Sequence, residues 1–282
     1  MDIQRIAAFC HEGGGGNPAG VVLLEAALPD TEMAQIAAEV GYSETAFAVR
    51  MGDGTQDWRV RYFAPEAEVP FCGHATIALG AVLGAEFGLN TYNLTLNAGT
   101  ISVVAETRGG AMAAVLSSPP TRSEDISDSV LSEALGLLGM SVADLDPRLP
   151  PARIHGGADH LMLALKDRDR LATMTYDLAQ GREIMRRHGF VTIMLVYVEA
   201  AQTFVVRNAF ASGGVLEDPA TGAAAAAFAG YLRDVGWPHG GQFAIRQGED
   251  MGMPSRIEVS LSDEPGAPVH VAGQARRIVS DD

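Results

Sequence analysis

Residues 62–87 read YFAPEAEVPFCGHATIALGAVLGAEF. We expect a strand that ends near Phe63, a loop, and an alanine-rich helix over 74–87. Gly73 lies beside the start of that helix, where free backbone N–H groups and the helix dipole favour negative charge. The stretch therefore predicts a helix start that can hold an anion.

A second stretch, GVLEDPATGA at 214–223, occupies the matching place in the other half of the chain, before a predicted helix over 219–235. Two such helix starts facing each other would hold a carboxylate and stabilise a developing enolate. Ordinary capping is the alternative, with Asp218 as N-cap and Pro219 in the first helical turn. Both interpretations stay open at this point.

The order of predicted elements is the same in both halves, which indicates an α/β (α+β) fold made of two similar domains. The Ser117-Ser118-Pro119-Pro120 stretch marks the connection, because two prolines interrupt regular structure. We expect helices at 31–40, 74–87, 129–138, 178–188 and 219–235. We expect strands at 3–9, 20–24, 44–49, 57–63, 92–96, 101–106, 111–116, 152–155, 161–165, 191–198, 203–208, 243–246, 256–261, 268–271 and 274–279.

Composition limits the partners. The 282 residues are 47% hydrophobic, enough for a large core, and carry a net charge of −15, which argues against nucleic acid and anionic membranes as partners. Two cysteines and the lack of a signal peptide favour the cytoplasm. Seven histidines show no metal-ligand spacing, so we expect no metal site.

Glu44 is a candidate general base. It precedes a strand and has no basic neighbour in Ser43-Glu44-Thr45-Ala46-Phe47, which suits a desolvated carboxyl group with a raised pKa. Most glutamates are solvated, and a histidine such as His74 is more often a capping or buried structural residue than a catalytic one. Arg59 and Arg61 are expected to form a surface ladder on one strand face.

Four motifs together resemble the PhzF family of phenazine biosynthesis-like isomerases: Gly16-Asn17-Pro18, Ser43-Glu44-Thr45-Ala46-Phe47, Cys72-Gly73-His74-Ala75-Thr76 and Glu217-Asp218-Pro219-Ala220-Thr221-Gly222. The resemblance implies the diaminopimelate epimerase-like fold, in which two pseudo-symmetric domains each wrap a barrel-like, mostly antiparallel sheet around a central helix. It implies domains at 1–117, with 273–282 returning to it, and at 118–272. It also implies a site in the cleft between them and a homodimer.

The resemblance also assigns roles. A glutamate matching Glu44 shuttles a proton between ring carbons of trans-2,3-dihydro-3-hydroxyanthranilate, and residues matching His74 and Asp218 assist. The Gly73 backbone lies beside the substrate. No cofactor is implied, and the expected partner is a small carboxylic acid. The expected substrate-binding residues are Asn17, Gly73, Thr221, Gly222 and Ala223.

Two departures keep alternatives open. Ala223 stands where the family commonly has a serine that can bind the substrate carboxylate. Cys72 stands where epimerases and proline racemases of this fold keep one catalytic thiol, but their second thiol corresponds to Asp218, which disfavours a two-thiol mechanism. Packing is the expected role of Cys72. The alternatives are a racemase that uses Cys72 with Asp218 or Glu44, and a non-catalytic protein that binds a small acid.

Overall fold

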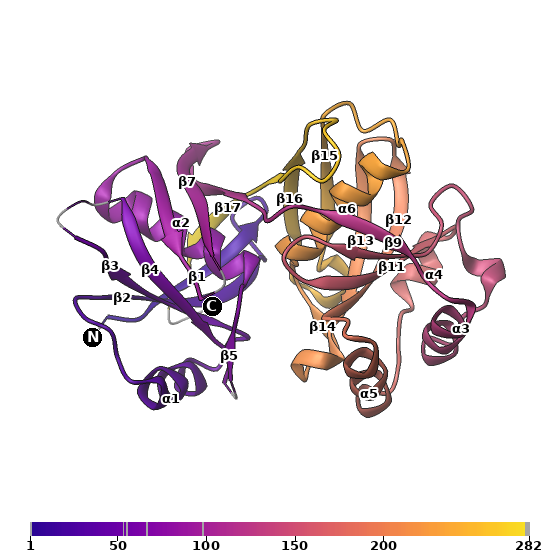
Figure 1. Cartoon of the computed structure of the whole chain (residues 1–282), viewed down its shortest axis with the longest axis horizontal. Helices are drawn as coiled ribbons and strands as arrows, with labels where there is room; N and C mark the ends of the chain where they lie inside the picture. Colours follow the sequence, from indigo (N-terminus) through magenta and orange to yellow (C-terminus); the bar gives the residue numbers. More distant parts are fainter. Residues whose placement is uncertain (1, 53, 55, 66, 98, 280–282) are drawn as a thin grey trace. The chain divides into compact units, whose positions relative to one another are not determined.

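The computed structural model describes residues 2–52, 54, 56–65, 67–97 and 99–279. Contacts divide the chain into two compact units, which Figure 1 shows in sequence colours. Unit 1 comprises Met1–Ser117 and Val271–Asp282, and unit 2 comprises Ser118–His270. The last strand thus belongs mainly to the unit that contains the first.

Unit 1 is a sheet that closes on itself. From β1 to β8 the neighbours pair as β1–β2 antiparallel, β2–β3 parallel, β3–β4 antiparallel, β4–β6 parallel and β6–β7–β8 antiparallel. Strand β17 pairs with both β1 and β8 and so completes the ring. The elements of unit 1 are β1 (Gln4–Cys10), β2 (Asn17–Leu24), α1 (Asp30–Val40), β3 (Thr45–Arg50), β4 (Asp57–Phe63), β5 (Glu68–Val69), α2 (Gly73–Phe87), β6 (Thr91–Thr95), β7 (Thr100–Arg108), β8 (Ala111–Ser117) and β17 (His270–Arg277).

Unit 2 repeats this pairing. Its strands pair as β10–β11 antiparallel, β11–β12 parallel, β12–β13 antiparallel, β13–β15 parallel and β15–β16 antiparallel, and β9 pairs with β10. The elements are β9 (Arg122–Asp125), α3 (Asp128–Leu137), β10 (Ala152–His155), β11 (Asp159–Leu165), α4 (Arg168–Ala172), α5 (Leu178–His188), β12 (Thr192–Ala200), β13 (Thr203–Ala209), β14 (Glu217–Asp218), α6 (Gly222–Asp234), β15 (Gln242–Gln247) and β16 (Ser255–Ser260). Equivalent order and direction in both units establish the internal pseudo-symmetry.

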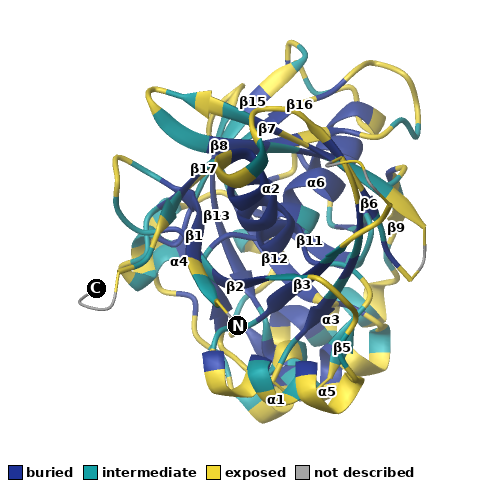
Figure 2. Ribbon diagram, turned by 90° about the vertical axis from the view of Figure 1, so that its left-hand side faces the viewer, coloured by how far each residue is buried: buried dark blue, intermediate teal, exposed yellow. Residues whose placement is uncertain are grey.

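Each unit buries one central helix, α2 in unit 1 and α6 in unit 2, drawn almost wholly dark blue in Figure 2. Helix α2 packs against β1, β2, β3, β7 and β8, so it is apolar on every side. Its fully buried Ile77, Leu79 and Leu83 each contribute roughly 1.5–3 kcal/mol.

Glycines let these helices approach the strands. A Cβ atom on Gly80 would lie 2.6 Å from the Val103 side chain and 2.8 Å from Ala114 Cβ. In unit 2 a Cβ on Gly156, just after β10, would lie 2.6 Å from the backbone nitrogen of Ala227 in α6. The distance between helix and sheet is therefore set by the absence of side chains at these positions.

The structure corrects the predicted start of the helix at 219–235. Asp218 belongs to the short strand β14, and α6 begins at Gly222 with Thr221 as N-cap, so Pro219 lies outside the helix and the capping interpretation of Asp218 and Pro219 is wrong. The strands expected at 268–271 and 274–279 are replaced by the single strand β17. Strands β5, β9 and β14 and helix α4 were not predicted. Strands β5 and β14 have only two residues each, β9 (RSED) has no apolar residue, and α4 (RDRLA) is a single, mostly charged turn, so none of them shows an apolar periodicity.

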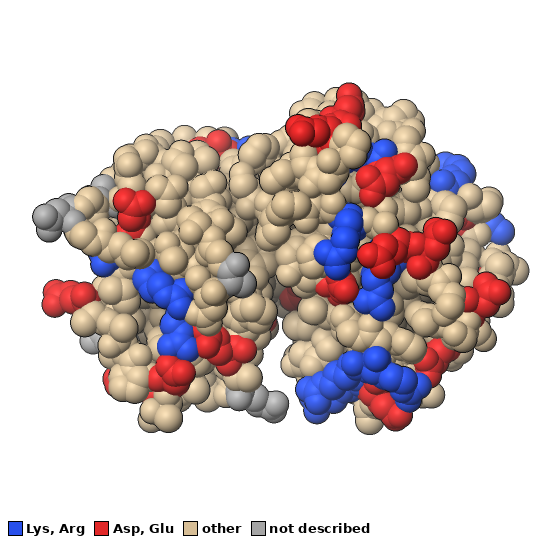
Figure 3. All heavy atoms as spheres, viewed as in Figure 1, with Lys and Arg blue, Asp and Glu red and all other residues tan. Residues whose placement is uncertain are grey.

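Several charged side chains on the surface form ion pairs. On the face of unit 2 drawn in Figure 3, basic and acidic side chains are interspersed. Ion pairs within this unit include Arg246–Glu199 and Arg168–Asp250. Arg61 pairs with Asp30 and Glu68, as expected of a surface ladder. Among the described residues, no helix has the length and hydropathy needed to cross a bilayer.

We predict that Gly80→Val will destabilise unit 1 by about 2 kcal/mol or more, because the new side chain must displace Val103 and Ala114 in a packed core. Urea unfolding followed by fluorescence of Trp58 in a Trp237→Phe background measures the loss, because Trp58 is buried in unit 1 and contacts Phe87 of α2. The control is Gly136→Ala in α3 of unit 2, where a Cβ meets nothing within 4 Å, and it should leave the Trp58 transition unchanged. Equal effects of the two substitutions would contradict the role given to close approach.

Candidate functional site

Glu44 is held at the beginning of β3 inside unit 1. Its backbone carbonyl accepts a hydrogen bond from the Gly20 N–H of β2 at 3.2 Å, and its residue is 8% exposed. Gly20 is required beside it, since a Cβ there would lie 2.6 Å from Thr45 Oγ1. Asn17, also buried, begins the same strand β2 three residues earlier.

The start of α2 brings two polar side chains, those of Cys72 and His74, to Glu44. His74 Nε2 lies 3.4 Å from Glu44 Oε2 and 3.4 Å from Ser43 Oγ. The Sγ atom of Cys72, the N-cap residue, lies 3.3 Å from His74 Nδ1, and Cys72 makes no side-chain capping hydrogen bond. Thr76 Oγ1 donates to the Cys72 carbonyl at 2.7 Å, which fixes the first helical turn.

The environment of Glu44 favours its neutral form. Desolvation raises the pKa of the carboxyl group, while hydrogen bonds from Ser43 and Cys72 lower it by a smaller amount. Oε2 is buried and has no hydrogen-bond partner among the described residues, although His74 Nε2 lies at ion-pair distance. A carboxyl group with a raised pKa is suited to accept a proton and to release it again.

Unit 2 presents a second polar helix start. Thr221, the N-cap of α6, donates its hydroxyl proton to Asp218 Oδ2 at 2.5 Å instead of capping the helix through its side chain. Gly222 and the half-buried Ala223 begin the helix, and its first turn contains no acidic residue. The backbone N–H groups of this turn are therefore suited to an anion.

Gln247 of β15 organises this second helix start. Its Nε2 donates to the Asp218 carbonyl at 2.7 Å and to Thr221 Oγ1 at 3.1 Å, and its Oε1 accepts from the Thr221 N–H at 3.3 Å. Asn208 Nδ2 donates to the same Oε1 at 3.3 Å. One amide side chain thus fixes both ends of the Asp218–Thr221 turn.

The hydrogen-bond chain continues into the core of unit 2. Thr192 Oγ1 donates to Asn208 Oδ1 at 3.0 Å and lies 2.8 Å from His160 Nδ1. His160 is fully buried, and desolvation lowers its pKa to about 3, so its imidazole is neutral at physiological pH. A fixed neutral tautomer can take part in this chain without bringing a charge into the core.

The structure divides the predicted site residues between the two units and shows Glu44 beside His74 and Asp218 beside Thr221. Unit 1 holds Asn17, Glu44, Gly73 and His74, and unit 2 holds Asp218, Thr221, Gly222 and Ala223. Sequence reasoning assigned no role to Ser43, Asn208 or Gln247, because polar residues that act through hydrogen bonds carry no spacing signal. It expected packing for Cys72, which in fact lies within hydrogen-bond distance of His74.

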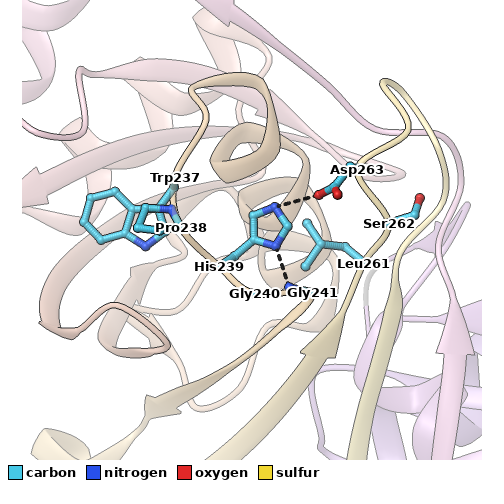
Figure 4. A pocket seen from close by; sticks show the side chains of 8 residues that line it. All are labelled: Trp237, Pro238, His239, Gly240, Gly241, Leu261, Ser262 and Asp263. Carbon is cyan, nitrogen blue, oxygen red and sulfur yellow. Dashed lines mark hydrogen bonds and ion pairs between the residues drawn. The ribbon is translucent and has the colours of Figure 1, made fainter.

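Glu44, Cys72 and His74 also form a set of three side chains whose donor atoms lie within 4.8 Å of one another. No metal-ligand spacing in the sequence predicts this set, because Glu44 lies far from Cys72 and His74 along the chain. A separate hollow of about 400 Å³ lies in unit 2 (Figure 4). It is lined by Trp237, Pro238, His239, Gly240, Gly241, Leu261, Ser262 and Asp263.

His239 serves the loop in that hollow. Its Nδ1 accepts from the Gly241 N–H at 3.0 Å, and its Nε2 lies 3.7 Å from Asp263 Oδ1, as the dashed lines in Figure 4 show. Both ring nitrogens are therefore engaged in holding a turn before β15. The hollow lacks the buried, unpaired carboxyl group that distinguishes the Glu44 cluster.

His160 makes the stability of unit 2 sensitive to acid. Its folded-state pKa of about 3 lies below its ordinary 6.5, so the unfolded chain binds more protons between these values. Stability is therefore lost as the pH falls below about 6.5, by about 1.4 kcal/mol per pH unit from this one group. We predict that the free energy of unfolding of unit 2 will change less steeply with pH, between about pH 6.5 and 4.5, in His160→Asn than in the wild type. Asparagine keeps a polar atom toward Thr192.

Urea unfolding followed by Trp237 in a Trp58→Phe background measures this effect in unit 2, because these are the two tryptophans of the chain. His270→Asn, at an exposed position, is the control and should keep the original slope. An unchanged slope for the His160 variant would show that acid destabilises unit 2 through other groups.

Comparison with known proteins agrees with this architecture. The profile of the PhzC-PhzF family, described as phenazine biosynthesis-like protein, matches residues 6–280. An uncharacterized isomerase from Deinococcus radiodurans is 35% identical over 266 residues, covering 91% of this chain and 85% of that protein.

Solved structures show the same fold. A PhzF-family phenazine biosynthesis protein from Bacillus anthracis superposes with a TM-score of 0.85 at 22% identity, covering 99% of this chain and 98% of the other. A predicted epimerase from Pseudomonas aeruginosa gives a TM-score of 0.83 at 25% identity, covering 98% and 96%. The fold is thus the epimerase-like one, with an isomerase among the relatives. The chain belongs to the PhzC-PhzF family of phenazine biosynthesis-like proteins and is an isomerase.

Proposed function

We propose that this isomerase works without a cofactor and moves a proton between two carbon atoms of a small carboxylic acid, with Glu44 as both base and acid. The observation that carries the proposal is the buried Glu44 carboxyl group, with its raised pKa, beside the first turn of α2. A group of this kind exchanges protons with carbon more readily than a solvated carboxylate does.

The proposed reaction has two steps. The Glu44 carboxylate removes a proton from a substrate carbon, and the electron pair moves into the conjugated system of the acid. Glu44, now protonated, returns the proton to a second carbon, so the enzyme ends in its starting state. Negative charge that develops between the steps is stabilised by His74 and by backbone N–H groups at the α2 start, including that of Gly73.

We assign substrate binding to Asn17 in unit 1 and to the Thr221–Ala223 start of α6 in unit 2, with Asp218 assisting. The support is the turn fixed by Gln247 and the N-terminal N–H groups of α6. Because Ala223 lacks a hydroxyl, the substrate carboxylate would be held there by backbone N–H groups alone. The physiological acid is thereby expected to differ from that of relatives with serine at this position. A homodimer, which rests on the resemblance, and a cytoplasmic location, which rests on the small number of cysteines and the expected lack of a signal peptide, are part of the same proposal.

Solvent exchange tests the role of Glu44. In deuterated water the wild type should introduce deuterium into trans-2,3-dihydro-3-hydroxyanthranilate or another small unsaturated acid. Glu44→Gln should reduce the rate by about 10²–10⁴-fold, since the amide can no longer take the proton. Glu39→Gln, at the exposed end of α1, is the matched control and should exchange normally.

Other outcomes separate the alternatives. If Glu44→Gln still introduces deuterium at the wild-type rate, Glu44 is not the group that transfers the proton. Products of inverted configuration, lost on alkylation of Cys72, would favour a racemase in which Cys72 acts with Glu44, an arrangement supported by their hydrogen bond. A ligand that raises the melting temperature while no deuterium enters any acid would favour a binding protein.

The Ser43 hydroxyl tunes the same group. Its hydrogen bond lowers the pKa of Glu44, so Ser43→Ala should raise that pKa and move the rising limb of the kcat/KM profile to higher pH. Ser43→Thr keeps the hydroxyl, so its kcat/KM profile should rise at the same pH as that of the wild type. A profile unchanged in the alanine variant would mean that the limb reports another group.

A further inference from the structure

The three side chains around Glu44 have the chemistry of a zinc site. They offer a carboxylate oxygen, a thiol sulfur and an imidazole nitrogen, the donor types that Zn²⁺ takes in proteins. All three residues are buried, with exposures of 8% for Glu44, 7% for Cys72 and 5% for His74. They all belong to unit 1, so the arrangement does not depend on unit 2.

The spacing of the donor atoms fits one ion. Around tetrahedral zinc, with bonds of about 2.0–2.3 Å, neighbouring donors are roughly 3.4–3.6 Å apart. His74 Nε2 lies 3.4 Å from Glu44 Oε2 and 3.9 Å from Cys72 Sγ. All three donor atoms lie within 4.8 Å of one another, so side-chain adjustments around a bound ion would bring them to bonding positions.

The local chemistry supports occupation by a cation. Glu44 Oε2 is buried without a hydrogen-bond partner among the described residues, which leaves an acceptor that an ion can satisfy. A carboxylate and a thiolate together carry two negative charges, which one divalent cation neutralises. Nitrogen and sulfur donors select zinc over Mg²⁺, which prefers oxygen ligands.

We propose that Glu44, Cys72 and His74 bind Zn²⁺ through Oε2, Sγ and Nε2 in a three-ligand site with its fourth position open. On binding, the Cys72 thiol proton, and the Glu44 proton where present, pass to solvent, and no oxidant or reductant takes part. The bound ion coordinates the Glu44 carboxylate, which the proposed isomerisation needs for proton transfer. Zinc is therefore an inhibitor of this enzyme, a consequence that rests on the proposed function, whereas binding itself does not.

Binding is tested on the full chain after treatment with a chelator. Calorimetric titration with ZnCl₂ should show one site per chain in the wild type and in Cys10→Ser, which removes the other cysteine. Cys72→Ser and His74→Gln should each weaken zinc binding by at least roughly 10–100-fold. That is the loss caused by removing a residue that only hydrogen-bonds to a metal ligand, and loss of a ligand itself should cost no less. Equal binding by wild type and Cys72→Ser, or equal binding of MgCl₂ and ZnCl₂ by the wild type, would overturn the proposal.

Cobalt gives a readout on the wild type alone, so the test does not depend on the folding of variants. Bound Co²⁺ should show thiolate-to-metal charge transfer and the intense visible bands of tetrahedral coordination, both removed by added Zn²⁺. Absence of the charge-transfer band would overturn the assignment of Cys72. Deuterium exchange with and without zinc is a separate measurement: zinc that binds without slowing exchange would leave the site standing and contradict its inhibitory role.

Discussion

The close approach of α2 to the strands around it is the constraint on which unit 1 depends. Gly80 lets the helix lie against Val103 and Ala114, and this packing sets how close the helix lies to the sheet. The start of α2 then carries Cys72 and His74 to Glu44, which a hydrogen bond from Gly20 holds at the beginning of β3. A larger residue at Gly80 would displace the helix start and so alter the chemistry without touching any ionisable group.

Burial of this helix start has a cost that falls on Glu44. The carboxyl group loses water and receives only weak hydrogen bonds from Ser43 and Cys72 in return, which is why its pKa rises. This shortage of hydrogen bonds to the buried Glu44 carboxyl group explains two of its properties. A carboxyl group that is poorly compensated as an anion is well matched to a carbon acid, and it is also an attractive ligand for a cation.

The sequence predicted the regular elements well and the contacts around them poorly. Strand β4, strand β10 and helix α5 lie at their predicted bounds, because periodicity over four or more residues reports which side faces a core. The start of α6 was misplaced because Pro219 and Asp218 also suit a helix start, and only tertiary hydrogen bonds from Gln247 hold them in a turn. Family motifs supplied Glu44 and His74 as candidates, but the cluster with Cys72 depends on the pairing of β2 with β3, which no local pattern specifies.

The two units use one architecture for two kinds of polar site. In unit 1 the helix start meets ionisable groups, with Glu44, Cys72 and His74 in mutual contact and a carboxylate oxygen without a hydrogen-bond partner. In unit 2 the equivalent helix start meets one ionisable group, the Asp218 side chain that accepts from Thr221, and otherwise amide and hydroxyl groups. The chain from Thr221 through Gln247 and Asn208 ends on a neutral histidine. Proton transfer needs a group that changes charge at low cost, whereas holding a carboxylate needs dipoles that do not move. The difference between the units is what we would expect if, as proposed, a group in unit 1 carries the proton and the helix start in unit 2 holds a carboxylate.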